Sequence, residues 1–204
     1  MTIAILQAPD IRLEVDLRPI PDLSEADFVM LCQANPELRL ERTAKGEILI
    51  MPPEGGESGY RGQTVGSQLF NWAKRDGRGV VFGSSTGFRL PNGATRSPDA
   101  AWVLRSRLSL LSPEQKREFL PLCPDVAIEV RSPTDRMPDL REKMDEYIAN
   151  GMQLGWLIDP DTRTVYVYRP GLPVEQIDHP PRLASDPELP GLVLELGDVW
   201  EPGF

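Results

Sequence analysis

The sequence predicts an α/β (α+β) domain in which helices flank a mixed β-sheet. Short apolar or alternating runs indicate strands, segments with a helical apolar repeat lie between them, and the order is helix, strands, helix, strands. The 204 residues, 40% of them hydrophobic, suffice for one domain with its own core. We expect an extended N-terminal arm over residues 1–22 and a single domain over residues 23–204.

The first half of the chain carries clear helix and hairpin signals. Ser24 and Asp27 have the spacing of a capping box and predict the start of a helix that Pro36 ends. The Lys45-Gly46 pair predicts a turn between two alternating runs. The elements expected here are a hairpin of residues 38–43 and 47–51, a helix over 57–75, strands near 79–83, 86–90 and 98–104, and a short helix over 113–119 capped by Ser112.

The second half is dominated by an apolar strand that contains one acid. Residues 125–131 read as a buried strand with Glu129 in the middle, and an isolated buried carboxylate costs several kcal/mol to desolvate. A helix is expected over 138–150, where Gly151 closes it. A hairpin around Asp161 and a strand near 191–196 complete the prediction.

Composition excludes several classes of function. The net charge of −9 argues against a broad phosphate-binding surface, although a local basic groove stays open. No apolar run approaches the length of a membrane-spanning helix. His179, the only histidine, lies in a proline-rich loop, and Cys32 and Cys123 lack a partner motif. We therefore expect no zinc site, and two reduced, buried thiols in a cytoplasmic protein.

Two predicted strands each carry one acid. Asp99 stands at the head of "PDAAWVL" and Glu129 lies within "DVAIEVR". If these strands are neighbours, the two carboxylates converge and repel, and a hard divalent cation such as Mg²⁺ or Mn²⁺ removes the conflict. The alternative from spacing alone is a buried ion pair of Glu129 with Arg131, Lys143 or Arg96.

Three further side chains are candidates for the same site. Arg131 follows Glu129 by two residues and projects to the same face of the strand. Lys143 borders the apolar face of the helix over 138–150, so it either reaches the acids or snorkels to solvent. Glu57 begins the helix over 57–75 and either leans towards the site or is an acid favoured by the helix dipole.

These residues carry a resemblance. The chain resembles the Uma-two family assigned as restriction endonucleases, within the PD-(D/E)XK nuclease superfamily, over roughly residues 25–200. The matching segments are "GEILIMPPEGGESGYR", "VFGSSTGFRLPNGATRSPDAAWVL", "FLPLCPDVAIEVRSPTDR" and "KMDEYIANGMQLGWLIDP".

The resemblance implies a restriction-endonuclease-like fold, Mg²⁺ (or Mn²⁺) bound by Asp99 and Glu129, and hydrolysis of DNA phosphodiester bonds. The superfamily's lysine position is occupied by Arg131, which stays protonated and cannot act as a base. Lys143 looks like its relocated replacement. Cleavage of both strands would suit a homodimer. The alternative function is a catalytically weak or inactive nuclease-fold protein that binds nucleic acid or a protein partner.

Overall fold

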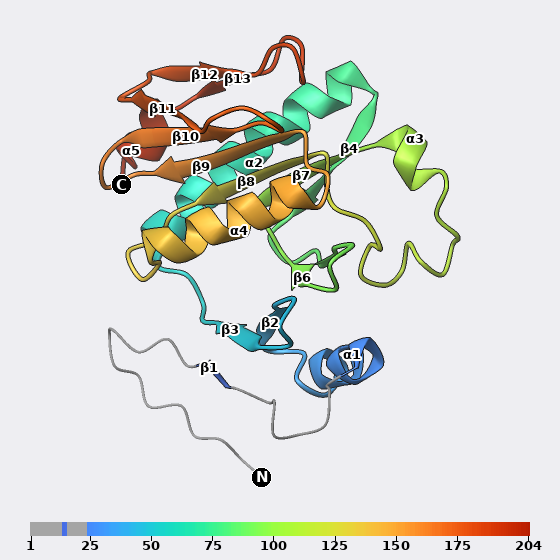
Figure 1. The fold of residues 1–204 in the computed structure, drawn as a ribbon. Helices are drawn as coiled ribbons and strands as arrows, with labels where there is room; N and C mark the ends of the chain where they lie inside the picture. The colour runs from blue at the N-terminus through green and yellow to red at the C-terminus, as the bar shows by residue number, and fades with distance from the viewer. Residues whose placement is uncertain (1–13, 16–23) are drawn as a thin grey trace.

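The computed structural model describes residues 14–15 and 24–204 (Figure 1). Apart from Glu14–Val15, which form β1, the predicted N-terminal arm lies outside the described residues. The described chain forms a six-stranded sheet, a five-stranded sheet and a two-stranded ribbon. This arrangement confirms the predicted mixture of helices and mixed sheet.

The six-stranded sheet is the centre of the molecule. Its order is β11-β10-β9-β8-β7-β4, with β8 and β9 parallel and all other neighbours antiparallel. A parallel pair needs a crossover, and α4 supplies it. The strands are β4 (Gly79–Gly83), β7 (Ala100–Leu104), β8 (Val126–Val130), β9 (Leu154–Asp159), β10 (Thr164–Tyr168) and β11 (Glu175–Asp178).

A helix covers each face of this sheet (Figure 1). The long helix α2 (Gly56–Asp76) packs on one face and α4 (Met137–Ala149) on the other. The side chains of β8 alternate between the two layers, so Ile128 joins the core beneath α2 and Ala127 joins the core beneath α4. The residue after Ile128 therefore faces α4, and that residue is Glu129.

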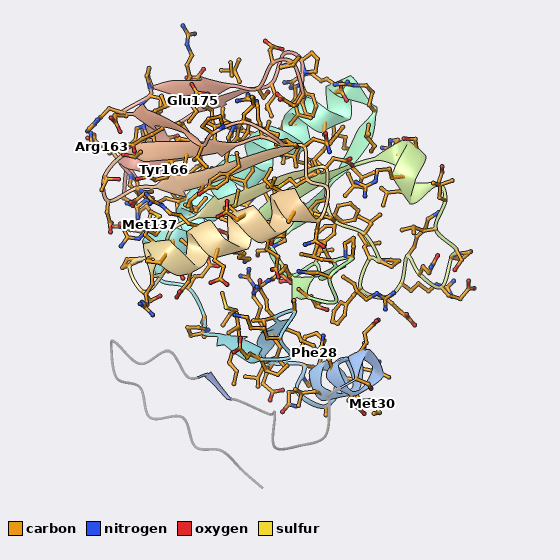
Figure 2. All side chains as sticks on the ribbon, in the orientation of Figure 1. Phe28, Met30, Met137, Arg163, Tyr166 and Glu175 are labelled. Atoms are coloured by element: carbon orange, nitrogen blue, oxygen red, sulfur yellow. The ribbon has the colours of Figure 1, made fainter. Side chains whose placement is uncertain are left out.

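The five-stranded sheet lies on the N-terminal side and has the order β1-β3-β2-β6-β5. Its strands after β1 are β2 (Arg39–Arg42), β3 (Ile48–Met51), β5 (Phe88–Arg89) and β6 (Thr95–Arg96). Helix α1 (Glu25–Ala34) begins with the predicted capping box of Ser24 and Asp27. Phe28 is fully buried on the side of α1 facing this sheet, whereas Met30 is exposed (Figure 2). The resulting core is small, with Phe28, Leu40 and Ile48 as its buried members.

One element prediction needs correction. The helix predicted over 113–119 is wrong, because this segment forms turns: its residues 113–118 are all exposed, so no apolar face stabilises a helix. Ser112 does cap one turn, accepting from the backbone of Gln115. A short helix, α3 (Arg105–Leu108), forms earlier instead.

The tail adds β12 (Arg182–Ala184), β13 (Val193–Glu195) and α5 (Gly197–Trp200). None of the described helices has the length and apolarity to cross a bilayer.

Candidate active site

Asp99 and Glu129 lie on the same face of the central sheet. The antiparallel register pairs Ala100 with Ile128 and Ala101 with Ala127. Continuing it by one residue sets Asp99 opposite Glu129, on the α4 face, where directly opposed side chains are neighbours. The two acids, 30 residues apart in sequence, are thereby brought together as the sequence predicted. The two carboxylates also interact electrostatically, because the charge of Asp99 raises the pKa of Glu129.

The carboxylate of Asp99 is fixed by the backbone of the neighbouring strand. Its Oδ2 accepts a hydrogen bond from the Val130 N–H at 2.8 Å, so the side chain takes the place of a backbone acceptor just beyond the last ladder pair. Its Oδ1 lies 3.7 Å from Nη2 of Arg39. Burial raises the pKa of Asp99, and the Val130 hydrogen bond and nearby cations offset that rise only in part. The Asp99 side chain keeps 18% of its surface exposed, which leaves a path to solvent.

Glu129 is buried, with 4% of its surface exposed, and two groups of α4 contact it. Its Oε1 lies 2.8 Å from Lys143 Nζ and accepts a hydrogen bond from the Tyr147 hydroxyl at 3.2 Å. Within the described residues, no hydrogen bond reaches its Oε2. Burial raises the pKa of Glu129 to about 7, against the opposing effect of Lys143 and with the help of Asp99 and Glu41. Desolvation is thus the main cause of the raised pKa, and the neighbouring acids Asp99 and Glu41 add to it.

Lys143 is held between two carboxylates. Besides Glu129, its Nζ donates to Oε1 of Glu41 at 3.0 Å. Burial acts to lower the pKa of Lys143, but Glu129 and Glu41 outweigh it and raise that pKa above its ordinary value. The side chain is therefore a buried ammonium and does not snorkel to solvent. Of the three cations that spacing offered to Glu129, the structure selects Lys143.

Glu41 is the member of this cluster that sequence analysis missed. It lies on β2 of the five-stranded sheet with 1% of its surface exposed. Besides Lys143, it accepts from the Ser97 N–H at 2.9 Å and from Arg96 Nη1 at 3.3 Å. Burial favours a raised pKa, but Lys143 and Arg96 outweigh it, so the pKa of Glu41 is lowered. Arg96 also donates from Nε to Glu146 of α4 at 2.5 Å.

The other two predicted site residues have partners outside this cluster. Arg131 Nη1 lies 3.1 Å from Asp159 Oδ1 and 3.2 Å from Asp161 Oδ2, at the end of β9. Glu57 pairs with Arg61 one helical turn further on at 2.9 Å, and 65% of its side chain is exposed. Neither residue contacts Asp99 or Glu129 among the described contacts.

The donor set suits a hard cation bound by few protein ligands. In the described part of the chain, no group of three or more His, Cys, Asp or Glu side chains is arranged to hold a metal. Asp99 and Glu129 supply two carboxylates with an excess of negative charge, and Glu129 Oε2 is available. Mg²⁺ is commonly held by one or two carboxylates together with waters and substrate phosphates, so the pair fits such an ion without a complete protein cage.

The model of the Uma2 family, described as "Putative restriction endonuclease", matches residues 25–197. The chain belongs to this family. Among solved structures, a similar fold is found in a "putative nuclease belonging to DUF820" from Anabaena variabilis ATCC 29413, with 25% identity and a TM-score of 0.68. That alignment covers 79% of this chain and 89% of the Anabaena chain. No curated protein matches the sequence.

The family match confirms the resemblance to the Uma-two family, and the similar fold of the Anabaena protein confirms the predicted fold class. The Uma2 match spans β2, which carries Glu41, through α4, which carries Lys143, so the whole cluster lies within it.

Proposed function

We propose that the protein is a Mg²⁺-dependent endonuclease of the PD-(D/E)XK type that hydrolyses DNA phosphodiester bonds. One observation carries this proposal: Asp99 and Glu129 share a face of the sheet, with the Lys143 ammonium 2.8 Å from Glu129. Excess buried negative charge beside a fixed cation is an arrangement that a divalent ion would stabilise. Membership of a family described as restriction endonucleases supports the reaction class.

Each residue has a role in this proposal. Asp99 and Glu129 would hold the ion, which supplies polarisation of a phosphoryl oxygen and activation of a water. Lys143 keeps its proton because of Glu41 and Glu129, so it acts through its charge and its N–H donors, orienting the attacking water and stabilising charge that develops on the phosphate. Glu41 positions the lysine and does not touch the substrate.

The test is nicking of supercoiled plasmid DNA with Mg²⁺ or Mn²⁺. We expect the parent protein to nick, and Glu129→Gln and Asp99→Asn each to abolish nicking. Glu37→Gln is the matched control, because Glu37 is an exposed acid, and it should nick as the parent does. Activity that persists in Glu129→Gln, or that needs no divalent ion, would contradict the proposal.

Calorimetry separates metal binding from chemistry. The parent should bind Mn²⁺ weakly, Asp99→Asn should not bind it, and Glu37→Gln should bind as the parent does. Equal binding by the parent and Asp99→Asn would assign the ion to another place.

A second function is favoured by one feature of the same cluster. Lys143 already lies between Glu41 and Glu129 at 3.0 and 2.8 Å, which balances part of the buried charge without an ion. A nuclease-fold protein that binds nucleic acid or a protein partner without cutting would keep such a pairing. DNA binding by the parent with no nicking under any divalent ion would select this function.

The cellular setting and assembly are proposals as well. Cys123 is buried as predicted, whereas Cys32 is only half-buried. We propose a cytoplasmic location for the protein. Cleavage of both strands of a duplex would place two copies of the chain on the DNA, and sedimentation with and without DNA would test for a homodimer.

A further inference from the structure

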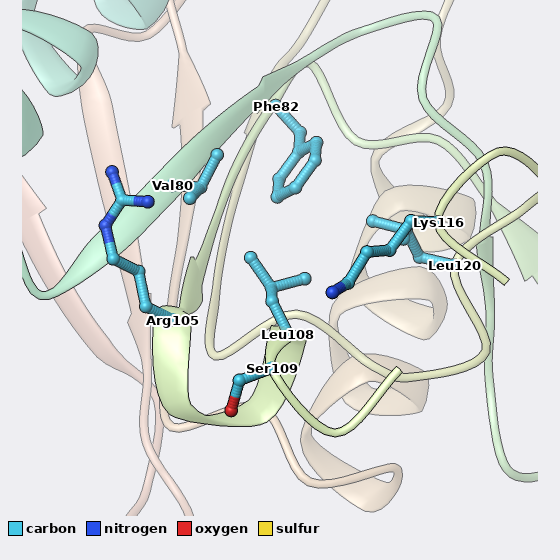
Figure 3. Close-up of a pocket in the computed structure, with 7 residues that line it drawn as sticks. All are labelled: Val80, Phe82, Arg105, Leu108, Ser109, Lys116 and Leu120. Carbon is cyan, nitrogen blue, oxygen red and sulfur yellow. The ribbon is translucent and has the colours of Figure 1, made fainter. Parts of the chain in front are cut away.

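A surface cavity of about 490 Å³ lies beside the edge strand β4, away from the acid cluster. Its interior is apolar and its sides carry two cations. Figure 3 shows Phe82 projecting into the cavity, with Arg105 and Lys116 on opposite sides of it. Its lining includes Val80, Phe82, Leu108, Leu120, Arg105 and Lys116.

The elements around the cavity fix its apolar part. Val80 and Phe82 alternate on β4 and so project from the same face of the strand. Leu108 comes from α3, and Leu120 from the segment that follows the turns over 113–118. The Phe82 ring stands at 89° to the ring of Phe88, with 5.7 Å between centroids, and this contact fixes its orientation.

Two cations line this cavity of an acidic protein. Arg105 and Lys116 belong to the lining, whereas the whole chain has a net charge of −9. Arg105 is anchored, because its Nε donates to the Gly77 carbonyl at 3.0 Å. Arg105 and Lys116 are both exposed. The cavity therefore combines an aromatic ring with two basic side chains.

We propose that this cavity binds single-stranded DNA, with one base against Phe82 and the flanking phosphates on Arg105 and Lys116. An aromatic ring in a basic groove is how proteins bind unpaired strands without reading their sequence. The cavity is large enough for one base and its sugar, at the size of ordinary ligand pockets. A base must be unpaired to enter it, so a duplex would not fit.

The inference rests on the proposed function in one respect, which is that the chain acts on DNA. Asp99 and Arg105 lie at opposite ends of β7, which separates them by about 20 Å at 3.3 Å per residue. A single strand of several nucleotides spans that distance, so the cavity would hold an unpaired segment while the acids act elsewhere on the same molecule.

The test is fluorescence anisotropy of a labelled oligothymidylate, measured in EDTA so that no chemistry intervenes. The full-length parent should bind it. Arg105→Gln/Lys116→Gln should weaken binding about tenfold and reduce the salt dependence by about one to two counterions. The matched control is Lys45→Gln/Arg182→Gln, which removes two exposed cations outside the cavity, and it should bind nearly as the parent does. Equal weakening in the two double variants would overturn the proposal, as would a parent that fails to bind.

Base contact is tested separately with an abasic strand of equal length. The parent should bind the abasic strand several-fold more weakly than oligothymidylate. Phe82→Leu should shrink this difference, and because the difference is measured within one protein, a modest loss of stability does not obscure it. An unchanged difference in Phe82→Leu would contradict stacking on Phe82. Displacement of the strand by equimolar thymidine monophosphate would reassign the cavity to a mononucleotide.

The proposed function fails separately from this inference. If the parent binds oligothymidylate through the cavity but does not nick plasmid DNA, only the proposed nuclease function is overturned. If the parent nicks plasmid DNA but the cavity variants bind oligothymidylate as the parent does, only the proposal for the cavity is overturned.

Discussion

Lys143 of α4 donates from Nζ to Glu41 of β2 at 3.0 Å, across a sequence separation of 102 residues. This contact joins the five-stranded sheet to the helix that covers the six-stranded sheet. Because Lys143 also lies 2.8 Å from Glu129, one ammonium links residues from three elements. The geometry of the acid pair therefore depends on a residue that lies outside the central sheet.

The first prediction concerns Glu41. Replacement by Gln leaves Lys143 with Glu129 and Arg96 with Glu146 but removes the buried charge between the two cations. We expect Glu41→Gln to lose about 3 kcal/mol of unfolding free energy, the lower end for breaking a buried ion pair. Urea denaturation against Glu37→Gln would measure it. A loss below about 1 kcal/mol would mean that the network contributes little to stability.

The second prediction concerns pH. The pKa of Glu129 is about 7 in the folded protein against an ordinary value of 4.5, so the folded protein retains a proton that the unfolded chain has already released. The stability from this group is complete below pH 4.5 and is lost as the pH rises through 7. Between pH 5 and pH 8 the metal-free parent should therefore lose up to about 3 kcal/mol relative to Glu129→Gln.

Urea denaturation at both pH values provides the measurement, with Glu37→Gln expected to follow the parent. If the parent instead gained stability over Glu129→Gln with rising pH, the ion pair with Lys143 would dominate and repulsion from Asp99 would be minor.

The third prediction separates the two cations near the acids. Lys143 contacts Glu129 directly, whereas Arg131 is held by Asp159 and Asp161. We expect Lys143→Gln to slow plasmid nicking at least a hundredfold, as for loss of a transition-state donor. Arg131→Gln should slow it by less than about tenfold. Denaturation curves would verify that both variants fold, and a larger loss in Arg131→Gln than in Lys143→Gln would reassign the lysine's role to Arg131.

The fourth prediction concerns the Tyr147 hydroxyl, which donates to Glu129 Oε1 at 3.2 Å. Tyr147→Phe keeps the ring and removes this donor, so we expect a loss of about 1 kcal/mol in the metal-free protein. The loss should be larger at pH 8 than at pH 5, because the hydroxyl favours the ionised carboxylate. Tyr168→Phe, which removes the hydroxyl of another buried tyrosine, should show no such pH dependence.

Much of the site was predictable because the spacing of apolar residues within a strand or helix indicates which of its faces is buried. The apolar run around Glu129 indicated a buried strand, and the helical angle of Lys143 placed it at the edge of the apolar stripe. Both inferences use periodicity within a single element, and both agree with the observed contacts.

Glu41 was missed because its environment is not local. It alternates with Leu40 on β2, a pattern typical of a hairpin with one polar face. Its burial comes from Ser97, Arg96 and Lys143, which lie far along the chain. A run of two cations and one acid in "LRLER" gave no hint that the acid alone would be enclosed. The failed helix over 113–119 has a related cause, since a cap predicts where a helix starts but not whether anything packs against it.

The small apolar cluster under α1 and β2 has a consequence for the contact between Glu41 and Lys143. Its buried members are only Phe28, Leu40 and Ile48, yet it anchors the strand that carries Glu41. Local unfolding of residues 25–51 would free Lys143 on one side, whereas the six-stranded sheet has apolar cores of its own.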